Sequence, residues 1–187
     1  MRVIAGKYKG FNLLSPKSKD SRPTDNKVKE AVFDMLYPFK VDFVGLDLFA
    51  GTGQMGIEFL SRGAYEVYFN EKNLSTFRIL KENLEKIKAA NAKVSKMDFK
   101  KALSTYKEDG LKFDYIFLDP PYDTNYLEDS LNLIIANELL ALNGIIITES
   151  DRDIDFSHEL DLSLIKEKSY GRKIIKFYIR NEDNISR

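Results

Sequence analysis

The chain has 187 residues, with 43% hydrophobic residues, a formal net charge of zero, no cysteine and one histidine. This composition is typical of a single globular domain, and it excludes disulfides, a thiolate nucleophile, zinc–cysteine clusters and multi-histidine metal sites. No apolar run is long enough to span a membrane, and residues 1–7 do not have the shape of a signal peptide. We therefore expect a cytoplasmic monomer that binds no membrane and no metal.

Residues 1–23 are expected to form an extension ahead of the main domain. Two short β-like runs, 2–5 and 11–14, flank two glycines and predict a β-hairpin, and residues 15–23 form a polar connector. Within residues 1–30, eight basic side chains stand against three acidic ones, a net charge of +5 that leaves −5 on the rest of the chain. A basic arm on an acidic body suits a polyanionic partner, and the alternative is a solvated surface segment. The basic residues are Arg2, Lys7, Lys9, Lys17, Lys19, Arg22, Lys27 and Lys29.

Hydrophobic periodicity predicts alternating helices and strands in a domain spanning 24–181, followed by a tail at 182–187. A first helix begins near Thr24 or Asp25, carries an apolar stripe from Val28 to Leu36, and ends before Pro38. Repeated strand–helix units predict an α/β fold with a mostly parallel sheet, helices on both faces and an antiparallel C-terminal hairpin. The expected strands are 43–49, 66–69, 93–96, 113–118, 144–148, 160–166 and 173–179, and the further helices are 55–62, 75–88, 99–106 and 127–137.

A glycine-rich turn follows the first strand of this domain. Gly51, Gly53 and Gly56 fit the pattern G-x-G-x-x-G between a predicted strand and a predicted helix, as a nucleotide-binding loop requires. Glycine allows the tight turn and the close approach of a ligand. Glu71 follows at the end of the next strand, where an acid can accept hydrogen bonds from both hydroxyls of an adenosine ribose.

Four acids, Asp47, Glu71, Asp98 and Asp119, fall at the ends of successive strands and should share one edge of the sheet. A dinucleotide would place its pyrophosphate on the helix N-terminus, whereas S-adenosyl-L-methionine carries a sulfonium and an ammonium. Clustered acids favour the cationic ligand, with Asp98 placed to accept from the adenine amine. Helix capping is the alternative role for Asp98 and Asp47.

The strand at 113–118 ends in Asp119-Pro120-Pro121-Tyr122. The two prolines remove two backbone donors, fix two φ angles and push the residue before each of them to an extended conformation. Carbonyls therefore point in fixed directions beside a carboxylate and an aromatic ring. Such a corner can grip the amine of a flat base and stack on its face, so these four residues are candidates for catalysis on a nucleobase amine.

Both motifs resemble those of a known superfamily. Residues 46–53 resemble the first motif of class I S-adenosylmethionine-dependent methyltransferases, and 119–122 resemble the [D/N]-P-P-[Y/F] motif of enzymes that methylate base amines or side-chain amides. Much of the chain is similar to the bacterial RsmD-type family of 16S rRNA guanine-N2 methyltransferases. Asn70 departs from that family, in which an apolar residue is usual at this position. The similar segments are 1–10, 22–24, 28–33, 51–64 and 170–171.

This resemblance implies a Rossmann-like methyltransferase fold with seven strands, S-adenosyl-L-methionine as cofactor, and 16S rRNA within the assembled small ribosomal subunit as partner. We expect Asp119 and the Pro120 carbonyl to accept the hydrogens of the guanine amine, and Tyr122 to stack on the base. The implied cofactor residues are Asp47, Phe49, Ala50, Gly51, Gly53, Glu71, Lys72, Met97, Asp98, Phe99 and Asp119. The expected RNA contacts are Arg2, Lys7, Lys9, Arg22 and Arg172.

Several alternatives remain open at the level of sequence. Arg22 and Thr24 can instead line the cofactor's methionine end, Arg172 and Lys173 can form a simple charged turn, and His158 reads as a surface residue. The enzyme could act on another nucleobase, such as an adenine, or on a protein glutamine. An NAD-dependent oxidoreductase would use the same glycine loop but leave 119–122 unexplained, and a non-catalytic RNA-binding module would keep only the fold.

Overall fold

A computed structural model of the chain describes residues 1–16, 26–122, 124–157 and 160–181. The expectations for Arg22, Thr24 and His158 lie outside these residues, as do the predicted boundary at residue 23 and the tail at 182–187.

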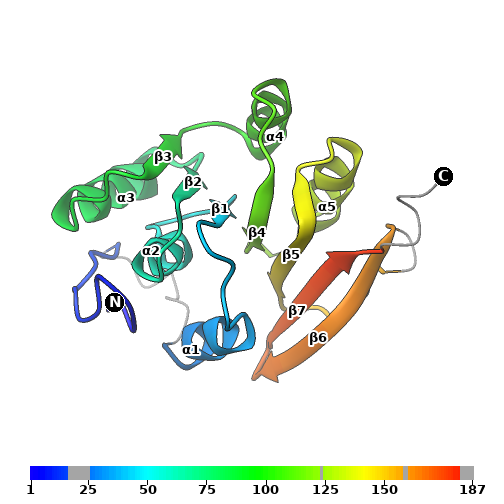
Figure 1. Cartoon of the computed structure of the whole chain (residues 1–187), viewed down its shortest axis with the longest axis horizontal. Coiled ribbons are helices and arrows are strands. Elements are labelled where there is room, and N and C mark those ends of the chain that lie inside the picture. Colours follow the sequence, from blue (N-terminus) through cyan, green and yellow to red (C-terminus); the bar gives the residue numbers. More distant parts are fainter. Residues whose placement is uncertain (17–25, 123, 158–159, 182–187) are drawn as a thin grey trace.

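The described residues form one seven-stranded sheet with the order β3-β2-β1-β4-β5-β7-β6 (Figure 1). Strands β1 to β5 pair in parallel, while β7 pairs antiparallel with both β5 and β6, so the predicted α/β class and the antiparallel C-terminal hairpin are confirmed. The strands are β1 (Val44–Asp47), β2 (Glu66–Asn70), β3 (Ala92–Ser95), β4 (Phe113–Leu118), β5 (Leu140–Ser150), β6 (Leu162–Tyr170) and β7 (Lys173–Arg180).

Helices cover both faces of the sheet, and each face has one hydrophobic cluster between the sheet and its helices (Figure 1). Side chains of α1, α2 and α3 pack on one face with Phe43, Tyr115 and Phe117, and side chains of α4 and α5 pack on the other with Leu46 and Ile116. The apolar stripes of the helices therefore point to opposite sides of one sheet, as the strand–helix alternation predicts. The helices are α1 (Asn26–Met35), α2 (Gln54–Ser61), α3 (Leu74–Lys86), α4 (Phe99–Glu108) and α5 (Tyr126–Ala136).

The chain path creates a switch point between β1 and β4. From β1 the chain moves outward through β2 to β3, and it then returns to the other side of β1 to form β4. Loops after β1 and β4 consequently leave the sheet in opposite directions, and open α/β sheets bind ligands in the crevice between such loops. The glycine turn follows β1 and the diproline corner follows β4, so both predicted motifs lie at this crevice.

The two runs of the N-terminal extension pair antiparallel over a short stretch around Arg2 and Asn12. The Val3 N–H donates to the Phe11 carbonyl at 3.0 Å, and the Leu13 N–H donates to the Met1 carbonyl at 2.7 Å. Two other backbone donors of the extension bind α2: the Ile4 N–H donates to Glu58, and the Lys7 N–H donates to the Ser61 carbonyl. The extension is therefore docked on the domain rather than self-contained.

Candidate active site

A cavity of about 1140 Å³ opens at the carboxyl ends of the parallel strands. It brings together most of the residues that the sequence singled out, from the loops after β1 to β4 and from the turn between β6 and β7. Asp119 and Phe49 also line a smaller neighbouring cavity of about 140 Å³, so the two spaces adjoin. The predicted residues on the larger cavity are Phe49, Gly51, Glu71, Lys72, Met97, Asp98, Phe99, Asp119, Pro120, Pro121, Tyr122 and Arg172.

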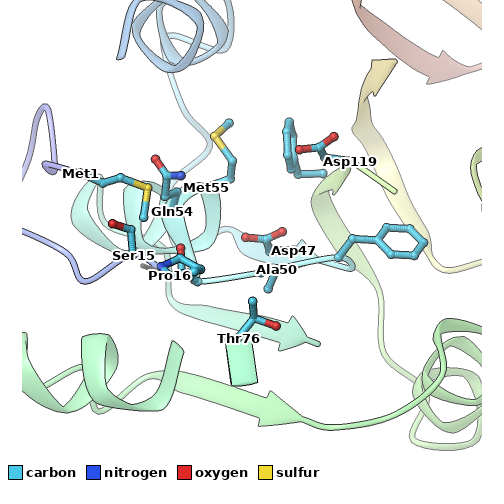
Figure 2. Close-up of a pocket in the computed structure, with 13 residues that line it drawn as sticks. Met1, Ser15, Pro16, Asp47, Ala50, Gln54, Met55, Thr76 and Asp119 are labelled. Carbon is cyan, nitrogen blue, oxygen red and sulfur yellow. The ribbon is translucent and has the colours of Figure 1, made fainter. Parts of the chain in front are cut away.

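The smaller cavity lies over the glycine turn (Figure 2). Asp47 and Ala50 line it, and Figure 2 shows Asp47 between Asp119 and a wall formed by Met1 and Gln54. The pocket therefore joins the end of β1 to the end of β4.

Each of the three positions of the glycine turn requires glycine for a different structural reason. Gly51 has a positive φ of 55°, and a Cβ on it would meet no atom within 4 Å, so this position is open to a ligand. Gly53 lines neither cavity: it is the N-cap of α2 with a φ of 88°, and a Cβ there would clash with Leu80. A Cβ on Gly56 would clash with the Phe69 ring, so this glycine lets α2 pack closely on β2.

Asp47 is a buried carboxylate beside this turn. It is 2% exposed, and its Oδ2 accepts a hydrogen bond of 2.8 Å from the Gly56 N–H. Burial raises the pKa of Asp47 to about 7, and the Glu71 carboxylate adds to this rise while the Gly56 N–H opposes it. A cationic ligand in the pocket would stabilise the ionised form, whereas a pyrophosphate would be repelled.

Glu71 holds the glycine turn in place. Its Oε2 accepts from the Gly51 N–H at 2.8 Å and its Oε1 from the Asn73 N–H at 2.6 Å. Each carboxylate oxygen keeps a second lone pair, so the predicted contact with ribose hydroxyls remains chemically open.

Asp98 caps a helix and also forms an ion pair. Its Oδ1 caps α4 by accepting from the Lys100 N–H, which confirms the capping role, and its Oδ2 forms an ion pair of 2.9 Å with Lys72. The hydrogen bond from Lys72 lowers the pKa of Asp98 below its usual range. The contact of Asp98 with an adenine amine stays a prediction.

Asn70, the residue that departs from the family pattern, has a clear structural use. It is buried, and its amide group donates to the carbonyls of Leu48 and Met97 while its oxygen accepts from the Met97 N–H and the Ser95 hydroxyl. One side chain thus ties together the ends of three strands. Sequence reasoning noted only that a polar residue stood at an apolar position, which is the signal that could have revealed this role.

The diproline corner places the half-buried Asp119 near the exposed ring of Tyr122. Burial raises the pKa of Asp119 well above its usual range, the carboxylates of Glu149 and Asp47 raise it further, and the Lys173 ammonium opposes them. Tyr122 is 39% exposed, and its hydroxyl lies 3.4 Å from Glu149 Oε1.

Only one of the two proline carbonyls at this corner is already engaged by a neighbouring side chain in the described contacts. The Pro121 carbonyl accepts from the Thr124 hydroxyl at 2.7 Å. The Pro120 carbonyl is therefore the better acceptor for an incoming amine, as the sequence predicts.

Glu149, at the end of β5, was missed by the sequence interpretation. Its side chain is buried, forms an ion pair with Lys173 and leaves Oε2 without a hydrogen-bond partner. Leu118 pairs with Thr148 in parallel register, which places Asp119 and Glu149 beside each other. Its signal in the sequence was the one used for the other acids, a carboxylate at the end of an apolar strand.

The basic side chains within residues 1–30 do not all face solvent. Arg2, Lys7 and Lys9 are exposed, but Lys29 is fully buried and pairs with Glu58 at 3.3 Å. Burial lowers the pKa of Lys29, and its ammonium also donates to the Arg2 carbonyl. Counting Lys29 in a polyanion-binding arm was therefore wrong, because its charge is already neutralised inside the protein.

The described part of the chain contains neither a metal-binding cluster nor a helix that could span a membrane. Within residues 1–16, 26–122, 124–157 and 160–181, no group of three or more histidines and acids could hold a metal ion. Over the same residues no helix has the length and apolarity that a membrane crossing needs.

Known proteins resemble this chain over almost its whole length. The family model described as Conserved hypothetical protein 95 matches residues 1–179. Ribosomal RNA small subunit methyltransferase D of Escherichia coli is 34% identical over 181 residues, which cover 96% of this chain and 90% of that protein. The Haemophilus influenzae protein of the same name is 34% identical over 183 residues, covering 95% of this chain and 93% of that protein.

A solved structure agrees with these sequence matches. It is yhhF from Escherichia coli, described as a methyltransferase, with a TM-score of 0.84, 33% identity and coverage of 96% of this chain and 97% of that one. The chain therefore belongs to the Conserved hypothetical protein 95 family, and the fold predicted from its motifs is confirmed as the Rossmann-like fold of methyltransferases.

Proposed function

We propose that this protein transfers the methyl group of S-adenosyl-L-methionine to the exocyclic N2 amine of a guanine in 16S rRNA, acting as a monomer in the cytoplasm on the small ribosomal subunit. The observation that carries the proposal is the position of Asp119, which lines both the cavity over the glycine turn and the cavity that contains Tyr122. A donor over the turn and a base on the tyrosine would meet at this carboxyl. The names of the relatives support rRNA as the substrate class.

The cofactor would lie along the edge of β1, β2 and β3. Asp47 would attract its ammonium, Glu71 would accept from its ribose hydroxyls, and Asp98 from its adenine amine. Phe49 and Phe99, whose ring centroids lie 5.4 Å apart, would flank the adenine. The fit rests on charge: a sulfonium ligand stabilises the ionised forms of the acids around it, including the buried Asp47.

The guanine amine is a poor nucleophile because its lone pair is delocalised into the ring. Asp119 and the Pro120 carbonyl would accept its two hydrogens, which turns the lone pair toward the methyl group and stabilises the positive charge that develops on nitrogen. When bound, the cofactor would supply an activated methyl group and leave as S-adenosylhomocysteine, so that a carbon–nitrogen bond replaces the carbon–sulfur bond. The methylated amine would then give its extra proton to the Asp119 carboxylate that already accepts its hydrogen. Positioning contributes most of the rate because the donor is already activated. No strong base is required, because the proton leaves after the methyl transfer.

The base has to leave its stack to reach this cavity, as in other enzymes that modify bases. Tyr122 would receive it on its exposed face. Arg172, which lines the same cavity, and the exposed Arg2, Lys7 and Lys9 would hold phosphates around it.

Calorimetry and nucleoside analysis together test the proposal. S-adenosylhomocysteine should bind the purified protein and NAD should not; tighter binding of NAD would refute the cofactor. Small subunits from cells that lack the protein should then acquire N2-methylguanosine when incubated with it and methyl-labelled cofactor. Label in an adenosine, or in a ribosomal protein, would refute the guanine assignment while leaving the methyltransferase activity in place.

A further inference from the structure

The N-terminal arm, defined as residues 1–16, forms one wall of the smaller cavity. Met1, Ser15 and Pro16 line this space together with Asp47 and Gln54 (Figure 2). The Oε1 atom of Gln54 is buried there without a hydrogen-bond partner. The arm that was expected to bind RNA thus also borders the space that the proposed function assigns to the methionine end of the cofactor.

One buried side chain joins this arm to the glycine turn. Asn83, in α3, is fully buried; its Oδ1 accepts from the Leu14 N–H at 2.7 Å, and its Nδ2 donates to the Leu14 carbonyl at 3.2 Å. The same Nδ2 donates to the Thr52 carbonyl at 2.9 Å. Thr52 is the residue between Gly51 and Gly53, so the amide group of one side chain is hydrogen-bonded to both the arm and the glycine turn.

The rest of the arm is fastened to the helix that follows the same turn. The Ile4 N–H donates to Glu58 at 2.9 Å and the Tyr8 N–H donates to the Ser61 hydroxyl at 2.9 Å. Gly6 packs so closely that a Cβ there would clash with the Ser61 carbonyl. Undocking the arm would leave Glu58, Ser61 and the Asn83 Oδ1 without their partners on the arm, which makes partial displacement costly. The arm and the segment 51–61 therefore behave as one unit.

We propose that Asn83 is a positioning residue that couples the arm to the cofactor site, so that docking of the arm and binding of S-adenosyl-L-methionine stabilise each other. The proposal rests on the proposed function for the identity of the ligand. Coupling between two sites is reciprocal in binding free energy. Because Arg2, Lys7 and Lys9 are exposed on this arm, RNA that binds them also raises the affinity for the cofactor, and a loaded enzyme holds RNA more tightly.

Hydrogen exchange on the unmodified protein is the first test. Saturating S-adenosylhomocysteine should slow exchange of the Leu14 and Tyr8 amides, whose acceptors are Asn83 and Ser61. Unchanged exchange at both amides, in a sample that calorimetry shows to be saturated, would overturn the coupling. This measurement needs no substitution and so stands even if a variant fails to fold.

Substitution of Asn83 is the second test, with Asn91 as its matched control. Asn83→Ala should weaken S-adenosylhomocysteine binding about tenfold or more and abolish the protection of Leu14, because the turn and the arm lose their shared partner. Asn91 also donates from one amide group to two backbone carbonyls, those of Ala64 and Tyr65, but touches neither the arm nor the turn. Asn91→Ala should keep wild-type affinity and protection.

Purified small subunits from cells lacking the protein provide the reciprocal readout. They should tighten S-adenosylhomocysteine binding by about fivefold or more in the wild type, and not in Asn83→Ala. Equal tightening in both proteins would overturn the role of Asn83. Failure of the wild type to bind S-adenosylhomocysteine at all would instead refute the proposed function, so the two failures are distinguishable.

Discussion

Replacing Asp119 by Asn should separate the charge of this carboxyl from its capacity to accept a hydrogen bond. Asn keeps an acceptor oxygen for the guanine amine but cannot ionise. A hydrogen bond to a charged group contributes about 1.5–3 kcal/mol and one to a neutral group about 0.5–1.5 kcal/mol, so Asp119→Asn should lose about 1–1.5 kcal/mol and slow methyl transfer about 5- to 15-fold at pH 8. Asp119→Ala removes the acceptor altogether and should slow it about 1000-fold, as loss of a transition-state hydrogen bond does elsewhere.

The pH dependence sharpens this prediction. Burial, Glu149 and Asp47 raise the pKa of Asp119, and only Lys173 opposes them among the causes identified. The ionised form is the one that accepts the amine hydrogens, so the wild-type rate should rise with pH until that pKa is passed, and should fall about tenfold per pH unit below it. Asp119→Asn should show no such rise, because its amide does not titrate.

The assay is single-turnover transfer of labelled methyl to small subunits, between pH 5.5 and 9, at saturating cofactor. Saturation matters because the pKa of Asp47 is about 7, and its ionisation would otherwise change cofactor affinity in the same range. Affinity for S-adenosylhomocysteine in both variants is the control for folding. Parallel pH profiles in the wild type and Asp119→Asn, or full activity in Asp119→Ala, would refute the role given to this carboxyl.

Three further predictions concern binding and stability. The pKa of Asp47 is about 7 in the folded protein against 3.8 in the unfolded chain, so the ligand-free protein should lose about 4 kcal/mol of stability as pH rises from about 4 to 7. Asp47→Asn should therefore flatten the pH dependence of urea unfolding and weaken cofactor binding. An unchanged pH dependence would contradict the burial argument. Lys29→Met should destabilise the protein by about 3 kcal/mol, because it leaves the buried Glu58 without one of its two cations. In a double-mutant cycle, adding Glu58→Gln to Lys29→Met should recover part of this loss, and purely additive effects would count against a direct pairing. Neutralising Lys7 and Lys9 should reduce the slope of log Kd for subunits against log salt by about 1 to 2, and an unaltered slope would remove the arm from the RNA interface.

The parts of the site that could be predicted from sequence are those fixed by local pattern. Gly51 and the segment 119–122 each follow an apolar strand, and parallel strands end at the same edge of a sheet, so their meeting needed no knowledge of packing. Asp98 caps a helix that begins directly after it, which is also a local relation. These features carry the assignment of the fold and of the two halves of the cavity.

The parts that could not be predicted depend on partners far apart in the chain. Asn83 meets Leu14 across 69 residues, and Lys29 meets Glu58 across 29, so neither polar residue could be recognised as buried and paired. Glu149 meets Lys173 only because β7 runs antiparallel to β5 in one particular register. The docking of the N-terminal extension on α2 could not be predicted for the same reason, because Ile4 and Tyr8 meet Glu58 and Ser61 across 54 and 53 residues.

Mass mapping of 16S rRNA tests the central claim most directly. Ribosomal RNA is compared from cells with the protein, cells without it, and cells that carry Asp119→Ala at the same protein level. One guanosine should bear a methyl group on N2 in the first sample alone. Identical methylation in all three samples, or a difference confined to a nucleoside other than guanosine, would contradict the account.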